Sequence, residues 1–322
     1  MKKVLALILT LAMALSLVAC SNPGGSNTGN STSGGNDKIL IGLAMHNQTS
    51  DWAVKFQEAF LEAAAAKGVD VTHTDANSVA SNQVGNIEDL VSQGIDALVV
   101  LPADYSALGQ ALKYANEKGV PIVNADSRVV AEDQPLVSSF ISADNYTAGY
   151  TLGEYLADTL PEGATVGTQN KPEISAIGLR FEGMAAAFHD KGRDDILIVE
   201  KIVTDSAQTA TYTEDMLMAN PEIETFVCLN DANALACYGA CKQLNRGEIR
   251  VYGFDGSPAG KQSIADGEMG GTLVYSPVDL AKAAFDAAYA ICTGGSYEKD
   301  FQIPMWMINA DNIDKHDTTS WE

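Results

Sequence analysis

The chain has 322 residues and carries 42 acidic against 20 basic side chains, which gives a net charge of −22 at pH 7. Such an acidic chain offers little basic surface for phosphate groups, which argues against nucleic acid as a partner. The length fits one large or two medium domains, and no apolar run beyond the first 20 residues is long enough for a membrane helix.

Residues 1–19 have the pattern of a signal peptide. Two lysines precede an apolar run that is too short to remain as a membrane span, and small residues stand before the expected cleavage point. These parts are Lys2 and Lys3, residues 4–17, and Val18 with Ala19. Loss of the two lysines lowers the net charge of the exported chain from −22 to −24.

The run Leu17-Val18-Ala19-Cys20 resembles the lipobox of bacterial lipoproteins. In that family the cysteine becomes the new N-terminus and is acylated, with palmitate among the acyl chains. The resemblance therefore implies that Cys20 is a lipid anchor on the extracytoplasmic face, in the periplasm or at the cell surface. Two or more acyl chains are enough to hold a protein stably on a membrane. An ordinary secretory signal with an incidental cysteine is the alternative.

A linker is predicted over residues 20–37, after the signal peptide. Residues 21–36 contain no aliphatic or aromatic side chain, so they have no apolar surface to bury in a core. A Gly/Ser-type chain of this length has a reach of about 20–25 Å. We expect this linker to hold a folded body clear of the lipid surface.

From residue 38 the sequence alternates short β-branched runs with segments of helical periodicity. Strands are predicted at 39–45, 69–74, 97–101, 122–125 and 139–142. Helices are predicted at 52–67, 83–93 and 107–118, and the first and third end in Lys-Gly, which is typical of a helix C-terminus. Strands of nearly continuous hydrophobicity indicate a parallel sheet with helices on both faces.

The same alternation restarts near residue 142. Strands are predicted at 164–168, 196–204, 225–229, 250–253 and 271–274. Helices are predicted at 148–159, 179–189, 210–218, 232–243, 258–265 and 278–292, before an extended tail at 302–308. The predicted fold class is therefore α/β, with two doubly wound parallel-sheet lobes. We expect one lobe to comprise residues 38–141 and 276–304, and the other residues 142–275 and 305–322.

The remaining cysteines and the histidines show no metal-ligand spacing. Cys237 and Cys241 fall four residues apart on one face of a predicted helix, where side chains are neighbours without matching disulfide geometry. We interpret these two, Cys228 and Cys292 as small apolar side chains rather than as metal ligands or disulfide partners. No metal ion and no cofactor is expected.

Polar residues directly follow several predicted strands, and ligands of open parallel sheets bind outside the carboxyl ends of the strands. Carboxylates and amides pair with neighbouring hydroxyl groups, arginine supplies a rigid fork of donors, and an aromatic ring covers the C–H surface of a sugar. Such a set favours a site that binds a sugar without reacting with it. The polar runs are residues 46–52, 102–104, 126–128 and 230–231, together with Asp255.

Two runs carry a resemblance to a known family. Asn230-Asp231-Ala232-Asn233-Ala234-Leu235 and Val251-Tyr252-Gly253-Phe254-Asp255-Gly256-Ser257-Pro258 closely resemble the paired signature of type I periplasmic sugar-binding proteins, the ribose-binding group in particular. The resemblance extends over residues 38–310. It implies two Rossmann-like lobes joined by three crossovers, which close on one small ligand and deliver it to an ABC transporter permease. We expect a monomer that contacts the membrane only through its lipid anchor.

Position by position, the resemblance also implies a set of site residues. Trp52 is expected to stack on the ligand, and four polar residues are expected to bind its hydroxyl groups. Those four are Asp126, Arg180, Asn230 and Asp255. The expected ligand-binding set also includes Arg128, Asp231 and Tyr275.

The chain departs from the ribose-binding pattern at two of these positions. Ribose-binding proteins follow the aspartate directly with arginine, whereas this chain has Asp126-Ser127-Arg128. They carry glutamine near the last crossover, where Tyr275 stands in this chain. We therefore expect a small neutral sugar or polyol that need not be ribose.

Other classes of protein fit the sequence less well or differ only in role. A transcriptional regulator with the same ligand domain would carry DNA-binding helices where the signal peptide and linker stand. An enzyme is disfavoured because residues 256–263 fail the phosphate-loop pattern and no nucleophile or dinucleotide motif occurs. Two alternatives stay open: a protein that presents its ligand to a membrane receptor or sensor kinase, and a binder of nucleosides or autoinducers.

Overall fold

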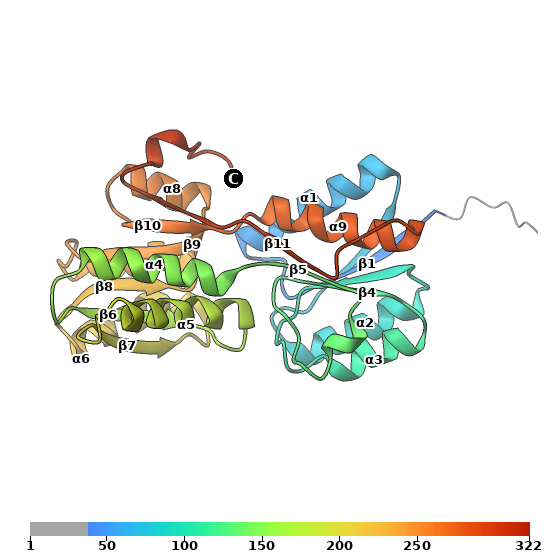
Figure 1. The fold of residues 1–322 in the computed structure, drawn as a ribbon, viewed down its shortest axis with the longest axis horizontal. Helices are drawn as coiled ribbons and strands as arrows, with labels where there is room; N and C mark the ends of the chain where they lie inside the picture. The colour runs from blue at the N-terminus through green and yellow to red at the C-terminus, as the bar shows by residue number, and fades with distance from the viewer. Residues whose placement is uncertain (1–37) are drawn as a thin grey trace, which may run out of the picture. The chain divides into compact units, whose positions relative to one another are not determined.

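The protein is described by a computed structural model that covers residues 38–322; the predicted signal peptide, Cys20 and the linker lie outside the described residues. Helices and strands alternate along the chain (Figure 1). The strands are β1 (Leu40–Met45), β2 (Asp70–Asp75), β3 (Ala97–Val100), β4 (Ile122–Ala125), β5 (Ser139–Ala143), β6 (Thr165–Asn170), β7 (Leu197–Ile202), β8 (Ile223–Cys228), β9 (Arg250–Asp255), β10 (Gly271–Val274), β11 (Asp300–Ile303) and β12 (Trp306–Asn309). The helices are α1 (Asp51–Lys67), α2 (Ala80–Ser92), α3 (Gly109–Glu117), α4 (Asn145–Thr159), α5 (Ser175–Asp190), α6 (Thr209–Ala219), α7 (Asp231–Gln243), α8 (Pro258–Ala265) and α9 (Pro277–Thr293), with short 3-10 turns η1 (Gln134–Leu136), η2 (Ser206–Gln208) and η3 (Ile313–Lys315).

The first sheet has the strand order β11-β5-β4-β3-β1-β2, and all its neighbouring strands are parallel. Its edge strand β11 comes from the end of the chain and aligns Asp300 with Phe140 of β5. Every residue of β3 and β4 is buried. Such continuous burial is expected for central parallel strands with helices on both faces.

The second sheet has the strand order β12-β10-β9-β8-β6-β7. Its edge strand β12 is antiparallel to β10, whereas the other neighbouring strands are parallel. Both sheets therefore gather the carboxyl ends of their parallel strands at one edge, which is where ligands bind in folds of this kind.

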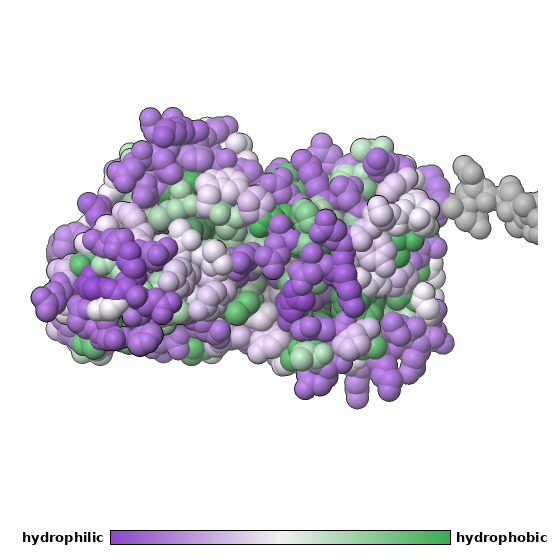
Figure 2. All heavy atoms as spheres, viewed as in Figure 1, coloured by the Kyte–Doolittle hydropathy of each residue, from purple (hydrophilic) through white to green (hydrophobic). Residues whose placement is uncertain are grey.

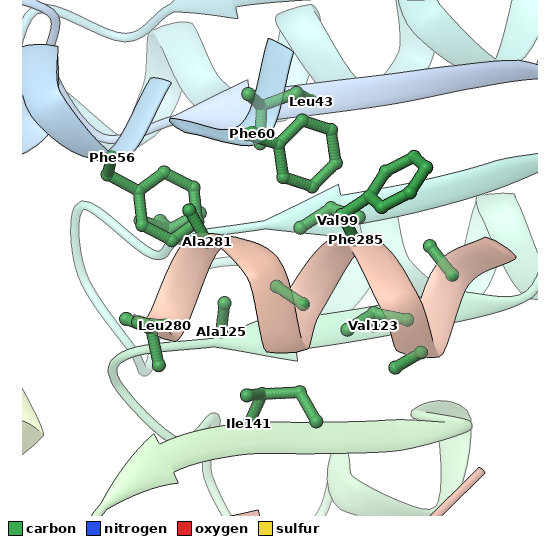
Figure 3. Packing of buried hydrophobic residues seen from close by; sticks show 14 of the residues in the cluster. Leu43, Phe56, Phe60, Val99, Val123, Ala125, Ile141, Leu280, Ala281 and Phe285 are labelled. Atoms are coloured by element: carbon green, nitrogen blue, oxygen red, sulfur yellow. The ribbon is translucent and has the colours of Figure 1, made fainter. Parts of the chain in front are cut away.

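Aromatic rings fill the space between the first sheet and helices α1 and α9 (Figure 3). Phe56 and Phe60 lie one turn apart on α1, and the ring of Phe60 meets Phe285 of α9 edge-on, with the centroids 5.6 Å apart. Each of these buried rings contributes about 2–3 kcal/mol through loss of apolar surface from water. Helices α2 and α3 cover the opposite face of the sheet with Ile87, Leu90 and Leu112 among the buried residues.

The second sheet is covered in the same way. Helices α4 and α5 form one layer, and α6, α7 and α8 form the other. Cys228 at the end of β8 and Cys237 and Cys241 on α7 are buried in the core on that side of the sheet, whereas Cys292 on α9 is half-buried. These thiols therefore act as small apolar side chains of the core.

The chain crosses between the two sheets at three places within residues 38–322: after β5, after β10 and after β11. Because of the second crossing, α9 near the end of the chain packs against α1 near its beginning (Figure 1). The two lobes belong to one compact unit. The predicted α/β fold with two doubly wound lobes and three crossovers is confirmed.

Some boundaries differ from those predicted. The tail expected at 302–308 forms two strands, β11 and β12, which belong to different sheets. Strand β5 extends to Ala143, one residue past the predicted strand 139–142, since it pairs with β11 up to that residue. Helix α5 begins at Ser175, before the predicted 179, so Arg180 lies inside the helix and not at its start.

Charged and polar residues cover most of the face shown in Figure 2, with smaller apolar patches between them. None of the helices in the described part of the chain is long and apolar enough to cross a membrane.

Candidate ligand-binding site

A cavity of about 480 Å³ is lined by residues of both lobes. This volume is within the usual range for small-molecule sites. Most of its polar lining comes from the carboxyl ends of strands, as the topology leads one to expect. His46, Asp126, Lys171, Asn230, Asp255 and Tyr275 each end or closely follow a strand, and Trp52 and Arg180 reach the cavity from α1 and α5.

Asp126 and Tyr275 meet at the wall of the cavity. The Tyr275 hydroxyl donates a hydrogen bond to Asp126 Oδ1 at 2.8 Å, although the two residues are 149 positions apart in the chain. Asp126 has a left-handed backbone with φ of 67°, and its main-chain oxygen accepts from Ser142 Oγ at 2.6 Å. Burial raises the pKa of Tyr275 well above its usual value, so the phenol stays protonated and remains a donor.

Trp52 is fixed at the cavity by a hydrogen bond and by stacking. Its indole Nε1 donates to the main-chain oxygen of Tyr275 at 2.9 Å. Its ring stacks on Tyr275 with centroids 5.3 Å apart and on Phe56 with centroids 5.7 Å apart. Trp52 lines the cavity, and these contacts hold its ring in place there.

Arg180 is buried in the second lobe with its guanidinium group directed toward the cavity. Its Nε donates to Asn145 Oδ1 at 2.8 Å, and its Nη1 donates to the main-chain oxygen of Leu229 at 3.0 Å. Helices α4 and α5 approach so closely here that a Cβ on Gly149 would lie 1.8 Å from the main-chain oxygen of Arg180. Only glycine fits at position 149, and this close approach of the two helices places Arg180 beside Asn145.

Asp255 ends β9 and faces the cavity with an incompletely satisfied carboxylate. Within residues 38–322, no side chain or main-chain N–H donates a hydrogen bond to it, and its nearest cation is Arg180 Nη1, 3.9 Å from Oδ1. Its backbone has φ of 106°, which is unusual for a residue with a side chain. Burial raises the pKa of this carboxyl well above its usual value, against the opposing effect of Arg180.

Asn230 and Asp231 are adjacent but have different surroundings. Asn230 lines the cavity, and its Oδ1 caps α7 by accepting from the Asn233 N–H at 2.9 Å. Asp231 is 1% exposed and does not line the cavity. Its carboxylate accepts from the N–H and hydroxyl of Ser257 at 2.7 and 2.8 Å, and from Thr272 Oγ1 at 2.7 Å. Burial raises the pKa of Asp231 to about 6.

Arg128 also lies outside this cavity. Its guanidinium group forms an ion pair with Asp300 of β11 and stacks over the Phe140 ring, 3.8 Å from the centroid. The structure thus brings together six of the expected ligand-binding residues at the cavity, and places Arg128 and Asp231 elsewhere. The six are Trp52, Asp126, Arg180, Asn230, Asp255 and Tyr275.

Several lining residues were not among those expected. His46 directly follows β1, and its buried Nδ1 has no hydrogen-bond partner in the described part of the chain. Burial lowers the pKa of His46, which favours the neutral ring. The position of His46 directly after a strand was the available signal. Asn47, Ser78, Lys171 and the residues 204–206 add further polar groups to the wall.

The cavity thus combines hydrogen-bond acceptors, donors and an aromatic face. Asp126 and Asp255 offer carboxylate oxygens from opposite lobes, and Arg180 offers guanidinium donors between them. Among residues 38–322, no group of three or more His, Cys, Asp or Glu side chains is arranged to hold a metal ion. This arrangement suits a ligand with several hydroxyl groups.

Comparisons with known proteins agree with this geometry. Residues 41–296 match the family described as the periplasmic binding protein domain. The chain is 32% identical over 308 residues to the ribose import binding protein of Bacillus subtilis (strain 168), covering 95% of this chain and 98% of that protein. It is 25% identical over 313 residues to the xylitol-binding protein of Mycolicibacterium smegmatis (strain ATCC 700084 / mc(2)155), covering 94% of this chain and 84% of that protein.

A solved structure shows the same architecture. An ABC transporter solute binding protein from Mycobacterium smegmatis with bound glycerol matches with a TM-score of 0.82 and 26% identity, over 88% of this chain and 100% of that one. The resemblance found in the sequence is thereby confirmed. The chain belongs to the periplasmic binding protein family and has the two-lobed type I fold.

Proposed function

We propose that this protein is an extracytoplasmic binding protein that captures a small neutral sugar or polyol between its lobes and delivers it to an ABC transporter permease. The observation that carries the proposal is the Asp255 carboxylate, which is buried at the cavity without a hydrogen-bond donor from residues 38–322. A buried carboxylate requires donors, and the hydroxyl groups of a sugar supply them.

The charges around the cavity favour a neutral ligand. Arg180 stands 3.9 Å from Asp255, so each of these groups is partly compensated by the other. Lys171 and Asp205 add one further charge of each sign to the lining, and the Asp126 carboxylate, which accepts a hydrogen bond from the Tyr275 hydroxyl, adds one negative charge. A strongly anionic or cationic ligand would leave one of the buried groups facing a like charge, at a cost that a neutral polyol avoids.

Relatives point to the same class of ligand. The ribose import binding protein and the xylitol-binding protein carry a pentose and a pentitol in their names. In the proposed site, Trp52 covers the C–H face of the ligand, and Asp126, Arg180, Asn230, Asp255 and Tyr275 bind its hydroxyl groups. Arg128 and Asp231 support neighbouring structure. Binding, with release of an unchanged ligand, is the proposed activity, and no catalysis is assigned.

Closure of two lobes is part of the proposal. We keep residues 38–141 with 276–304 as one lobe and residues 142–275 with 305–322 as the other. Rotation at the crossovers would enclose the ligand and exclude water, as in other hinged binding proteins. We further propose that the mature protein is a monomer whose acylated Cys20 anchors it to the membrane beside the permease.

A ligand screen tests the proposal. Thermal unfolding of the purified protein is measured with pentoses, hexoses, polyols and nucleosides, and calorimetry follows for each compound that raises the melting temperature. The proposal expects saturable binding of a sugar or polyol without chemical change of the ligand. Selective binding of nucleosides would favour the alternative ligand class, and turnover of any compound would favour an enzyme.

A further inference from the structure

Ser127 stands at one of the two places where the chain departs from the ribose-binding pattern, and it lies at a contact between the lobes. It follows Asp126 in the first lobe and is fully buried. Its hydroxyl donates to Asp126 Oδ2 at 3.3 Å and accepts from the Ala176 N–H of α5, in the second lobe, at 3.4 Å. One hydroxyl group can satisfy both bonds, because it has one proton to donate and lone pairs to accept.

The loop that carries Ser127 is held firmly by its own lobe. The buried Asn124 side chain donates to the main-chain oxygen of Ser127 at 2.8 Å and accepts from the Val129 N–H at 3.1 Å. The side chain of the next residue, Arg128, is tied to Asp300 and to the Phe140 ring. These contacts leave the Ser127 hydroxyl directed at the other lobe.

The start of α5 lacks a cap from its own lobe. The residue before the helix, Ile174, provides no side-chain hydrogen bond to the first turn. The Ala176 N–H is therefore one of the helix-terminal donors that must find a partner elsewhere, and Ser127 from the first lobe provides it. Ala176 is 3% exposed, so water is a poor substitute for this partner.

A second bond crosses the lobes at the same place. Ser175 Oγ donates to the main-chain oxygen of Arg128 at 3.2 Å. Both bonds depend on the lobes being together, and α5 also carries Arg180. The contact thus joins the helix that holds Arg180 to the loop that holds Asp126.

We propose that Ser127 is a positioning residue for ligand capture, whose hydroxyl orients the Asp126 carboxylate and caps α5 across the lobes, and so stabilises the arrangement that encloses the ligand. This inference rests on the proposed function for its effect on affinity. It also predicts an effect on the Ala176 amide that needs no ligand.

The test compares Ser127→Ala with the wild-type protein. Ligand affinity should fall roughly fivefold to thirtyfold, mainly through faster dissociation, because the lost bonds hold the enclosed state and not the encounter. Hydrogen exchange at the Ala176 amide, followed by NMR, should become at least roughly fivefold faster as that amide loses its partner. The melting temperature should change little, since the lobes keep their own cores.

Two further variants sharpen the test. Ser263→Ala is the matched control, because Ser263 is buried in α8 and its hydroxyl has no hydrogen-bond partner in residues 38–322; affinity and Ala176 exchange should stay unchanged. Ser175→Ala removes the second bond from a less buried position and should weaken binding roughly twofold to fivefold. It keeps the inference testable if Ser127→Ala does not fold.

The outcomes separate this inference from the proposed function. If the wild-type protein binds a sugar and Ser127→Ala binds it equally well with unchanged Ala176 exchange, the inference is overturned and the proposed function stands. If the wild-type protein binds no sugar or polyol, the proposed function fails, and the exchange at Ala176 alone decides whether the contact between lobes exists. Faster exchange supports the contact, and unchanged exchange refutes it.

Discussion

Replacement of Asp255 by asparagine tests the residue on which the proposed site depends most, because its buried carboxylate receives no hydrogen bond from residues 38–322. The side chain keeps its size, and asparagine tolerates the positive φ of 106° at this position better than alanine would. The change removes one negative charge and replaces one acceptor oxygen by a donor. Because Ser257, and not Asp255, caps α8, loss of a helix cap is not expected to contribute.

The expected magnitude follows from the contacts that Asp255 lacks within the protein. Hydrogen bonds from ligand hydroxyl groups to a buried carboxylate contribute about 1.5–3 kcal/mol in total. Their loss corresponds to affinity that is roughly ten- to a hundredfold weaker or more.

The same variant should alter the pH dependence of stability. Burial raises the pKa of Asp255 in the folded chain, so the folded state holds the proton more tightly than the unfolded chain does. The stability linked to this group is present below the unfolded pKa of about 4 and is lost as the pH rises through the folded pKa. Asp255→Asn should make the free energy of unfolding depend less on pH, because asparagine does not titrate. It should also raise the melting temperature of the ligand-free protein at pH 8.

Isothermal titration calorimetry and thermal unfolding of the same samples test both effects. The reasoning predicts weaker binding together with equal or greater stability, which is the usual relation at a binding site whose groups are kept unsatisfied for a ligand. Unchanged affinity for the confirmed ligand would refute the assignment of Asp255 to the site. A large loss of stability at pH 8 would show that the carboxylate serves the fold instead.

Three further predictions concern other parts of the chain. Arg180→Lys keeps the charge but loses the planar fork of donors, so calorimetry should show affinity at least roughly tenfold weaker. Arg246→Lys is the control, because Arg246 pairs with Glu248 outside the cavity, and its affinity should stay within about twofold. Glu322→Gln removes the anionic partner that lies 2.7 Å from the fully buried Lys261 ammonium. Urea unfolding should therefore show a free energy of unfolding lower by about 3 kcal/mol. An unchanged free energy of unfolding would contradict this prediction. Cys20→Ala should move the protein from the membrane to the soluble fraction with ligand binding intact, and continued membrane association would exclude the lipid anchor.

Much of the site could be predicted because it lies at strand ends. Short β-branched runs in the sequence predict the strands, and in a parallel sheet the carboxyl ends of the strands lie at one edge. Asp126, Asn230 and Asp255, which line the cavity, could therefore be proposed from their positions at strand ends together with the family resemblance. His46 belongs to the polar run 46–52 that follows a strand but is not in the expected ligand-binding set, since a single histidine after a strand has no distinguishing spacing.

The remaining contacts depend on residues that are far apart in the chain. Arg128 is drawn away from the cavity by Asp300, which lies 172 positions later. Asp231 is directed into the second lobe by Ser257 and Thr272, the latter 41 positions later. No periodicity in the sequence indicates such pairings, because they form only when a late strand returns to an early sheet or when neighbouring loops meet.

The split of the tail into β11 and β12 has a similar cause. The sequence predicts one extended segment at 302–308, but Pro304 interrupts it between the two sheets. Proline cannot donate to a strand ladder, so pairing stops there and resumes on the other lobe. The crossover is therefore explained by one residue, whereas the choice of partner strand follows only from the assembled fold.

Calorimetric titration of the purified wild-type protein with ribose, xylose, xylitol and myo-inositol tests the central claim most directly. The account predicts that one of these neutral polyhydroxy compounds, or a close relative from the screen, binds at a single site with a dissociation constant that is roughly micromolar or tighter, and that Asp255→Asn weakens this binding. The absence of saturable heat with every sugar and polyol tested, or binding that is unaffected by Asp255→Asn, would contradict it.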